Sequence, residues 1–212
     1  MARNKNTVWI SDLFGNASLI KGFDSDNYLQ DSDRAVKVMR DNVLGIAMPA
    51  DCFPSEYYHT GSGKFISKTY VHLLGGDPVV TGELAELLRQ FNLGKSALYP
   101  TKLFQKDRKT RIEGDFFCLN FGEHKTCILP DQSDKISRPF TPYKPGDPDI
   151  WKVAFVKDDE VAVSADALDG VDMWIDPKVR RAIFFSDPLV KALKKAKMAT
   201  KFWLKKCRVI SY

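Results

Sequence analysis

The sequence predicts an α+β fold with a mainly antiparallel sheet and a few amphipathic helices, and three observations support this class. Short runs rich in β-branched and aromatic residues are more frequent than helical patterns. Polar turns separate several of these runs, which favours antiparallel pairing. Two of the runs lead through a Thr or Ser into an amphipathic helix and then into another apolar run, so two similar strand-cap-helix-strand units are expected.

The first part of the chain carries mixed patterns. Residues 7–10 are β-branched and aromatic and predict a first strand. A turn region rich in Asp and Ser follows. The next segment is either a short helix, capped by Ser32 or Asp33, or a strand over residues 35–39. Its β-branched content does not decide between the helical and the strand period. Residues 65–74 fit a strand or a helix equally well.

Residues 78–100 form the first of the two units. Thr81 is expected to cap its helix and Gly94 to end it. The packed face of this helix consists of Leu84, Leu87, Leu88 and Phe91. Residues 98–104 and 115–121 then predict an antiparallel hairpin with an exposed polar tip.

A further strand is expected over residues 126–129. Five prolines between positions 130 and 149 predict a long ordered loop or a hinge. Strands follow over residues 150–156 and 161–163, on either side of a charged turn, and over residues 171–174.

Residues 181–204 form the second unit. Ser186 follows a short apolar strand and is placed to cap a helix, with Asp187 and Pro188 as residues favoured in a first turn. The apolar face of this helix consists of Leu189, Ala192, Leu193 and Ala196. A second strand is expected over residues 202–204.

The two units align with each other and resemble a known family. Residues 184–193 match residues 79–88, which gives both helices the same capped start. The segments that carry the resemblance are Pro78-Val79-Val80-Thr81-Gly82-Glu83-Leu84-Ala85-Glu86-Leu87-Leu88, Leu98-Tyr99-Pro100, Phe117-Cys118-Leu119-Asn120, and Ile183-Phe184-Phe185-Ser186-Asp187 with Leu189 and Leu193. In this order and spacing they resemble the immunity protein eleven family, formerly a domain of unknown function, of bacterial polymorphic-toxin and contact-dependent competition systems.

This resemblance covers residues 75–205 and implies an immunity protein that binds and neutralises a cognate protein toxin. The family contributes no catalytic motif, so no enzymatic activity is expected. Residues 75–212 would be the immunity-family domain. Residues 1–74 fall outside the resemblance and either pack on the same domain or form a small subdomain.

The composition is that of an ordinary soluble globular protein, with 44% hydrophobic and 28% charged residues in 212. No apolar run approaches the ~20 residues that a membrane-spanning helix needs, and the first residues lack the apolar core of a secretory signal. The four cysteines are too scattered for a disulfide scaffold. They are expected to be reduced thiols of a cytoplasmic protein, with a hairpin pairing of Cys118 with Cys127 as the alternative.

No catalytic residue, metal ligand or cofactor site is predicted. The cysteines and the histidines lack the spacing of a zinc site, and no Gly-x-Ser-x-Gly elbow occurs. The Gly61-Ser62-Gly63-Lys64 segment lacks the earlier glycine of a phosphate-binding loop, where Tyr58 stands instead. Dense acidic groups lie in predicted surface turns, where Asp is common for conformational reasons.

Positive charge is concentrated near the end of the chain. Residues 178–208, the basic segment, contain eleven Lys and Arg against the single acid Asp187, whereas the whole chain carries only +5. A surface of one sign favours an acidic partner. The predicted toxin-binding residues are Arg180, Arg181, Lys191, Lys194 and Lys195, with an aromatic loop containing Phe53, Tyr57 and Tyr58.

The alternative function is nucleic-acid binding, in which the basic segment neutralises phosphates and the interleaved Phe202 and Trp203 stack on bases. Burial of both aromatic residues in a strand would argue against it. A homo-oligomer is also possible, because the acidic remainder of a second copy would balance the basic segment.

Overall fold

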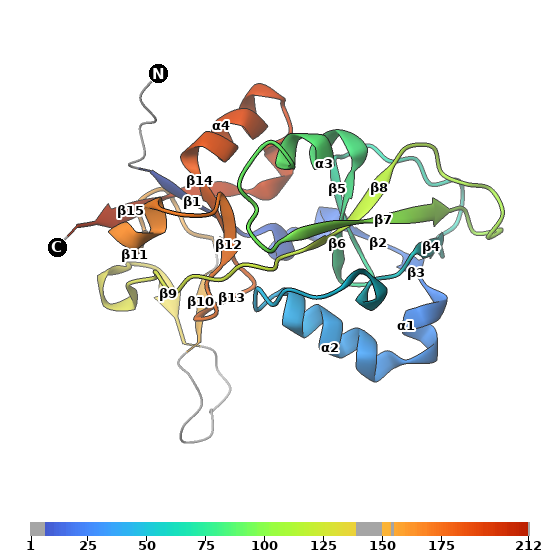
Figure 1. Ribbon diagram of the computed structural model, residues 1–212, viewed down its shortest axis with the longest axis horizontal. Coiled ribbons are helices and arrows are strands. Elements are labelled where there is room, and N and C mark those ends of the chain that lie inside the picture. Colours follow the sequence, from blue (N-terminus) through green and yellow to red (C-terminus); the bar gives the residue numbers. More distant parts are fainter. Residues whose placement is uncertain (1–6, 139–149, 154, 212) are drawn as a thin grey trace.

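The structure is a computed structural model that describes residues 7–138, 150–153 and 155–211 (Figure 1). These residues form four α-helices and fifteen strands in three sheets. Most paired strands run antiparallel, which confirms the predicted α+β class with a mainly antiparallel sheet. The helices are α1 (Asp26–Gln30), α2 (Ser32–Asn42), α3 (Gly82–Leu88) and α4 (Asp187–Lys195).

The three sheets differ in size. The seven-stranded sheet has the order β2 (Ile20–Lys21), β5 (Val71–Leu74), β6 (Asp77–Thr81), β8 (Phe116–Asn120), β7 (Ala97–Phe104), β4 (Glu56–His59) and β3 (Phe23–Asp24). The five-stranded sheet has the order β11 (Val161–Ser164), β15 (Leu204–Ile210), β1 (Val8–Ser11), β14 (Ile183–Ser186) and β12 (Met173–Ile175). The small sheet has the order β13 (Val179–Arg180), β10 (Trp151–Val153) and β9 (Ile136–Ser137). Short 3-10 helices are η1 (Leu13–Gly15), η2 (Ala17–Leu19), η3 (Ala50–Cys52), η4 (Pro130–Gln132), η5 (Ala165–Leu168) and η6 (Thr200–Phe202).

One five-stranded unit occurs twice in this fold. The first unit has the strand order β5-β6-β8-β7-β4 with α3, and the second unit has the order β12-β14-β1-β15-β11 with α4. Strand directions also agree, because three successive pairings are antiparallel and the last one, β7 with β4 or β15 with β11, is parallel. Only the source of the central strand differs: β8 follows β7 directly, whereas β1 comes from the start of the chain.

The registers of the two units match as well. Thr81 and Ser186 both end the strand that precedes the helix. The N–H of Thr81 donates to the carbonyl oxygen of Tyr70 at 2.9 Å, and the N–H of Ser186 donates to that of Asp172 at 2.9 Å. Tyr70 and Asp172 are therefore equivalent positions, and the alignment of residues 79–88 with residues 184–193 holds in three dimensions.

The helix-bearing faces of the two units pack against each other and form the central core. Leu84 and Leu88 of α3 and Leu189 and Leu193 of α4 are buried there with Phe185 of β14. Burying one such side chain stabilises the fold by roughly 1.5–3 kcal/mol. Both helices lie at the top of the molecule in Figure 1. Neither unit can therefore be removed without exposing the apolar face of the other.

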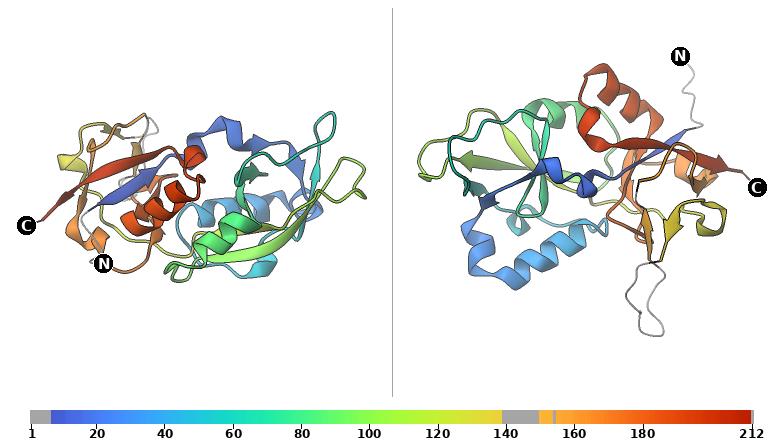
Figure 2. Two further views of the ribbon diagram at one scale, coloured as in Figure 1. Left: turned by 90° about the horizontal axis from the view of Figure 1, so that it is seen from above. Right: turned by 180° about the vertical axis from the view of Figure 1, so that it is seen from behind.

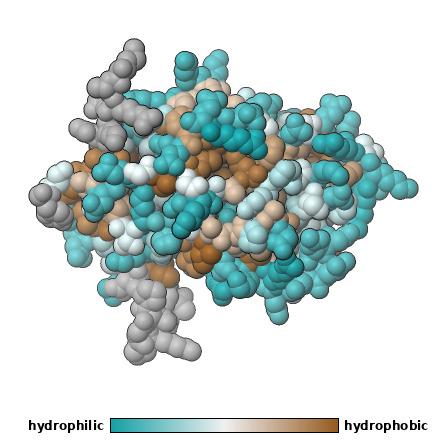
Figure 3. Space-filling view, in the orientation of Figure 1, coloured by the Kyte–Doolittle hydropathy of each residue, from teal (hydrophilic) through white to brown (hydrophobic). Residues whose placement is uncertain are grey.

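The outer faces of the large sheets are covered by different elements. Helix α2 packs Val38 in one cluster with Tyr57 and Leu103 on the seven-stranded sheet. On the five-stranded sheet, Trp174 and Phe184 stack with ring centroids 5.8 Å apart and share a cluster with β10 of the small sheet. On the face of the molecule seen in Figure 1, hydrophobic residues gather toward the middle. Hydrophilic residues cover the end where β7 and β8 project (Figure 3).

The N-terminal part of the chain contributes to both large sheets. Strand β1 lies between β14 and β15, and the chain then crosses to the other unit, where it forms β2 and β3 (Figure 2). The described part of residues 1–74 is thus built into the same body as the rest of the fold.

Several predicted elements differ from the observed ones. Residues 35–39 belong to a helix and not to a strand, but its cap is Asp31, whose carboxylate accepts from the N–H of Arg34 at 2.9 Å. Residues 126–129 form only an isolated bridge. The strand expected over residues 202–204 is wrong, because Trp203 has a φ of 49° and β15 begins one residue later. Residues 139–149 of the expected proline-rich loop lie outside the described residues.

The two predicted caps behave differently. Ser186 Oγ accepts from the N–H of Leu189 at 3.4 Å and donates to the Asp172 carboxylate at 2.5 Å. Thr81 occupies the N-cap position of α3 but its side chain makes no capping hydrogen bond. The prediction of a side-chain cap is confirmed for Ser186 and wrong for Thr81.

Replacing each cap residue by Ala separates the two cases. Ser186→Ala should lower the free energy of unfolding by about 0.5–2 kcal/mol, because a cap and a bond to Asp172 are lost. Thr81→Ala should change it by less than about 0.5 kcal/mol. Urea unfolding of both variants measures this, and equal losses would contradict the assignment of the caps.

Candidate functional site

The described residues hold one serine–histidine contact and no cluster of metal-ligating side chains. They contain no group of three or more His, Cys, Asp or Glu that could hold a metal ion. Ser67 and His72 come nearest to a nucleophile and base pair, with 2.8 Å between Ser67 Oγ and His72 Nε2. The other ring nitrogen faces the hydroxyl of Thr69 at 3.5 Å and not a carboxylate. Burial also lowers the pKa of His72 to about 4, which makes it a weak base.

Asp77 is the one buried carboxyl with a strongly raised pKa among the described residues. Its Oδ2 accepts from the hydroxyl of Tyr28 at 2.5 Å and from that of Tyr57 at 2.9 Å. Burial raises its pKa to about 6, and the two tyrosine hydrogen bonds oppose this shift. The group joins α1, β4 and β6 inside the fold, so its role is structural.

Two of the predicted lysines of α4 already have partners within the fold. Lys191 Nζ lies 2.6 Å from Asp187 Oδ2, and Lys194 Nζ lies 3.7 Å from the centre of the Trp9 ring. Trp9 also donates its indole N–H to Asp187 at 3.1 Å. Two of the three lysines thus contact side chains at the junction of α4 with β1, although all three are exposed.

Arg180 and Arg181 lie at the opposite end of β14 from α4, so the structure separates them from the lysines. Both arginines are exposed and line a groove of about 670 Å³ with Ile20 and Val36, whose side chains are 62% and 60% exposed. The basic segment is one block in sequence but covers at least two surfaces.

The predicted aromatic loop is mostly core. Phe53 and Tyr57 are buried, and Tyr57 and Tyr58 belong to β4. Tyr58 is half-buried, stacks with Phe104 and lies under the guanidinium of Arg108, 4.5 Å from the ring centre. Phe53 and Tyr57 therefore cannot meet a partner without a change in the fold, which corrects the expectation of an exposed aromatic loop.

The surface best suited to a partner lies elsewhere and centres on Phe155 and Trp203. They are 90% and 45% exposed and flank a groove of about 510 Å³. The groove, called the aromatic groove below, is lined by Ile10, Asp12, Val153, Phe155, Val156, Lys157, Trp203, Leu204 and Lys205. An exposed aromatic pair over an apolar floor is a common feature of protein interfaces.

Both aromatic residues are held in unusual backbone conformations. Phe155 has a φ of 55° and Trp203 a φ of 49°, in the left-handed region that bulky residues rarely adopt. Such conformations cost on the order of 1–3 kcal/mol each. At Trp203 this conformation directs the chain from η6 into β15, next to the buried Phe202.

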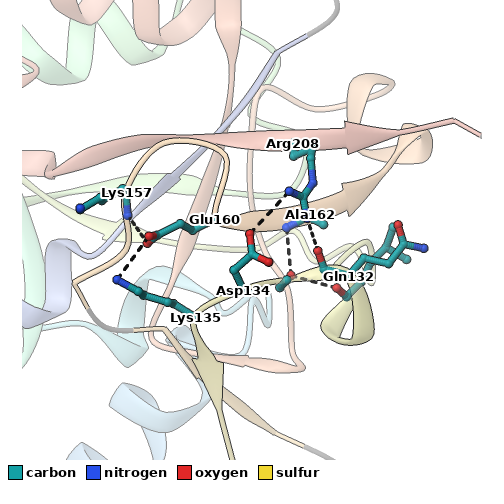
Figure 4. A network of polar contacts seen from close by, with 9 residues as sticks. Gln132, Asp134, Lys135, Lys157, Glu160, Ala162 and Arg208 are labelled. Atoms are coloured by element: carbon teal, nitrogen blue, oxygen red, sulfur yellow. Dashed lines mark hydrogen bonds and ion pairs between the residues drawn. The ribbon is translucent and has the colours of Figure 1, made fainter.

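A polar network holds the wall that carries Phe155 (Figure 4). Glu160 Oε2 accepts from the N–H of Lys157 at 2.6 Å, and its carboxylate pairs with Lys135 at 3.3 Å. These contacts, chiefly the hydrogen bond from Lys157, lower the pKa of Glu160. Arg208 of β15 pairs with Asp134 at 3.5 Å and so ties the segment that carries Lys135 to the sheet. The N–H of Asp159 donates to the carbonyl oxygen of Lys206 at 2.9 Å, which ties the turn after Phe155 to β15.

Charge around the aromatic groove is mainly positive. Lys157 and Lys205 line it, and Asp12 is its one acidic lining residue. Burial raises the pKa of Asp12, and the hydrogen bond from the backbone of Gly15 opposes this shift. The sequence predicts Phe155 to lie inside a strand. Its position beside the charged turn is the one local signal that indicates exposure.

The remaining sequence expectations concern the thiols and the membrane. All four cysteines are free thiols, and Cys118 does not pair with Cys127. Within the described residues no helix combines the length and apolar character needed to cross a membrane.

Comparison with known proteins adds no assignment. No protein-family model matches the chain, and no curated protein matches it in sequence.

Two lysines of α4 provide a test of their structural role. Lys191→Glu should lower the free energy of unfolding by about 1 kcal/mol, because it places a second carboxylate beside the buried Asp187. Lys195→Glu, on the same helix but without such a contact, is the matched control and should leave the free energy of unfolding unchanged. Chemical unfolding at low salt distinguishes them, and equal effects would contradict this assignment.

Asp77 gives the fold a pH dependence. Its folded pKa of about 6 lies above the unfolded value of 3.8, so the protonated form is favoured in the fold. Its contribution is complete below pH 3.8 and is lost as the pH rises to about 6. Wild type should lose about 3 kcal/mol more than Asp77→Asn over that range. Unfolding curves at several pH values test this, and parallel profiles would refute it.

Proposed function

We propose that this protein is an immunity protein, which binds a cognate bacterial toxin and neutralises it without catalysis. The aromatic groove is the observation that supports this function best, because an exposed Trp and Phe over an apolar floor suit a stoichiometric binder. The resemblance of the two units to the immunity protein eleven family points in the same direction.

The proposed contact is a central anchor with a charged rim. Trp and other aromatic residues dominate binding energy when a partner removes them from water. Lys157 and Lys205 would face acidic residues of the toxin, which mainly speeds association. The toxin surface is therefore expected to be apolar at its centre and acidic around it.

The proposed site of action is the cytoplasm of the producing cell. Four free thiols suit a reducing compartment, in which disulfides are rare. Protection against a toxin that acts outside the cytoplasm would contradict this part of the proposal.

Co-expression with the product of the neighbouring reading frame tests the function. A cognate toxin should stop growth alone, and this protein should restore growth and co-purify with the toxin in a fixed ratio. Restored growth with no complex, or with chemically altered toxin, would show that the protein acts by another mechanism.

Nucleic-acid binding remains the alternative, and one aromatic residue favours it. Trp203 is partly exposed near Lys205, whereas Phe202 is buried, so only Trp203 is placed to stack on a base. Retention on heparin that falls steeply with salt would support this alternative. A flat response between roughly 50 and 300 mM salt, the range over which phosphate contacts weaken, would remove it.

Single substitutions in the aromatic groove should weaken toxin binding. Phe155→Ala and Trp203→Ala should each cost at least about 2 kcal/mol of binding free energy without loss of fold. Val36→Ala, an exposed apolar residue of the other groove, is the matched control. Titration calorimetry with purified toxin measures these three variants and Arg180→Glu. Loss of binding in Val36→Ala or in Arg180→Glu, with normal binding in the first two, would move the interface to the groove beside α2.

A further inference from the structure

The internal duplication places two grooves in equivalent positions, one filled and one open. In the second unit the groove lies beside Ser186, Asp187 and Asp172, and the chain segment 90–92 of the first unit occupies it. In the first unit the groove lies beside Thr81, Gly82 and Tyr70. The open space is about 170 Å³ in the second unit and about 700 Å³ in the first.

The filled groove shows how a chain segment docks there. The N–H of Asp172 donates to the carbonyl oxygen of Asn92 at 2.7 Å, and the N–H of Asn92 donates back to the Asp172 carboxylate at 2.9 Å. The Asn92 side chain also donates to the carbonyl oxygen of Gly170 at 3.3 Å. The occupant is thus a short piece of backbone that pairs with the strand end next to the helix.

The open groove keeps the donor that the filled groove uses. Tyr70 is equivalent to Asp172, and its carbonyl oxygen accepts from Thr81 as that of Asp172 accepts from Ser186. Within the described residues the N–H of Tyr70 donates to no acceptor, and the residue is exposed. A backbone carbonyl of an incoming chain would satisfy this N–H.

Charge indicates which side chain the incoming segment carries. The lining of the open groove contains four acidic residues and one lysine: Glu83, Glu86, Glu113, Asp115 and Lys68. Glu86 pairs with Arg89 at 2.5 Å and Asp115 with Arg111 at 3.8 Å. Glu83 and Glu113 form no ion pair with described residues, so a basic side chain from outside would find two carboxylates without a cationic partner there.

We propose that the groove bounded by Ser67–Tyr70, Thr81–Glu86 and Glu113–Phe117 binds a short, extended, basic peptide segment of a partner protein. The segment accepts a hydrogen bond from Tyr70 N–H and places Lys or Arg between Glu83 and Glu113. Phe116 and Phe117 form the apolar part of the lining. This site is separate from the aromatic groove and its test requires no toxin.

A peptide that copies the natural occupant is the probe. We would titrate ¹⁵N-labelled protein with a capped hexapeptide of residues 88–93 that carries Gln90→Lys. The amide signals of Tyr70 and Gly114 should shift saturably, with a dissociation constant of about 1 mM or tighter. The same peptide with Arg89→Glu and Gln90→Glu should cause no shift.

Variants of the protein complete the test. The double variant Glu83→Lys with Glu113→Lys should raise the dissociation constant of the basic peptide at least about tenfold. Asp51→Lys, which reverses an exposed acid outside the groove, should leave this constant unchanged. Equal shifts with both peptides, or unchanged binding in the double variant, would overturn the proposal. Shifts at Tyr70 that depend on protein concentration alone would overturn it in favour of a second copy as occupant.

Discussion

Mutual burial of the two helix-bearing faces is the constraint on which the rest of the structure depends. Each unit presents one apolar sheet face with one helix, and the leucines of α3 and α4 remove both faces from water together. This arrangement uses the inner surface of each sheet completely. The outer faces are covered by α2 on one side and by the small sheet on the other, so the sheet faces are not available to a partner.

The exposed aromatic residues contrast with this well-buried interior. Phe155 and Trp203 combine high exposure with a left-handed backbone, and both properties are unfavourable for the isolated fold. Surrounding contacts, including the pairing of Arg208 with Asp134, hold this region in place. A complex that covers the two rings would recover their burial free energy at little cost in ordering, which is consistent with a preformed binding surface.

Local patterns predicted the units better than they predicted the surface. Ser186 and the spacing of Leu189 and Leu193 are local signals, so the second helix was predictable from the sequence. The insertion of β1 between β14 and β15 depends on contacts about the full length of the chain apart, which no local pattern encodes. The lysines of α4 looked like one surface with Arg180, but β14 separates them in space.

The exposure of Phe155 could not be predicted from the sequence for a similar reason. An apolar residue at the end of a predicted strand is usually buried, and only its left-handed conformation turns this ring outward. Thr81 shows that a matching local pattern can also mislead. It has the residue type and position of a cap, but its hydroxyl makes no capping hydrogen bond. Residue type predicts which interactions are available, and packing decides which ones form.

Hydrogen exchange of the complex with the proposed toxin tests the central claim most directly. If the aromatic groove is the interface, amides in residues 155–157 and 203–205 should exchange more slowly in the complex, and those of α2 should not change. Protection confined to α2 and the groove beside it, with none at residues 203–205, would contradict the account.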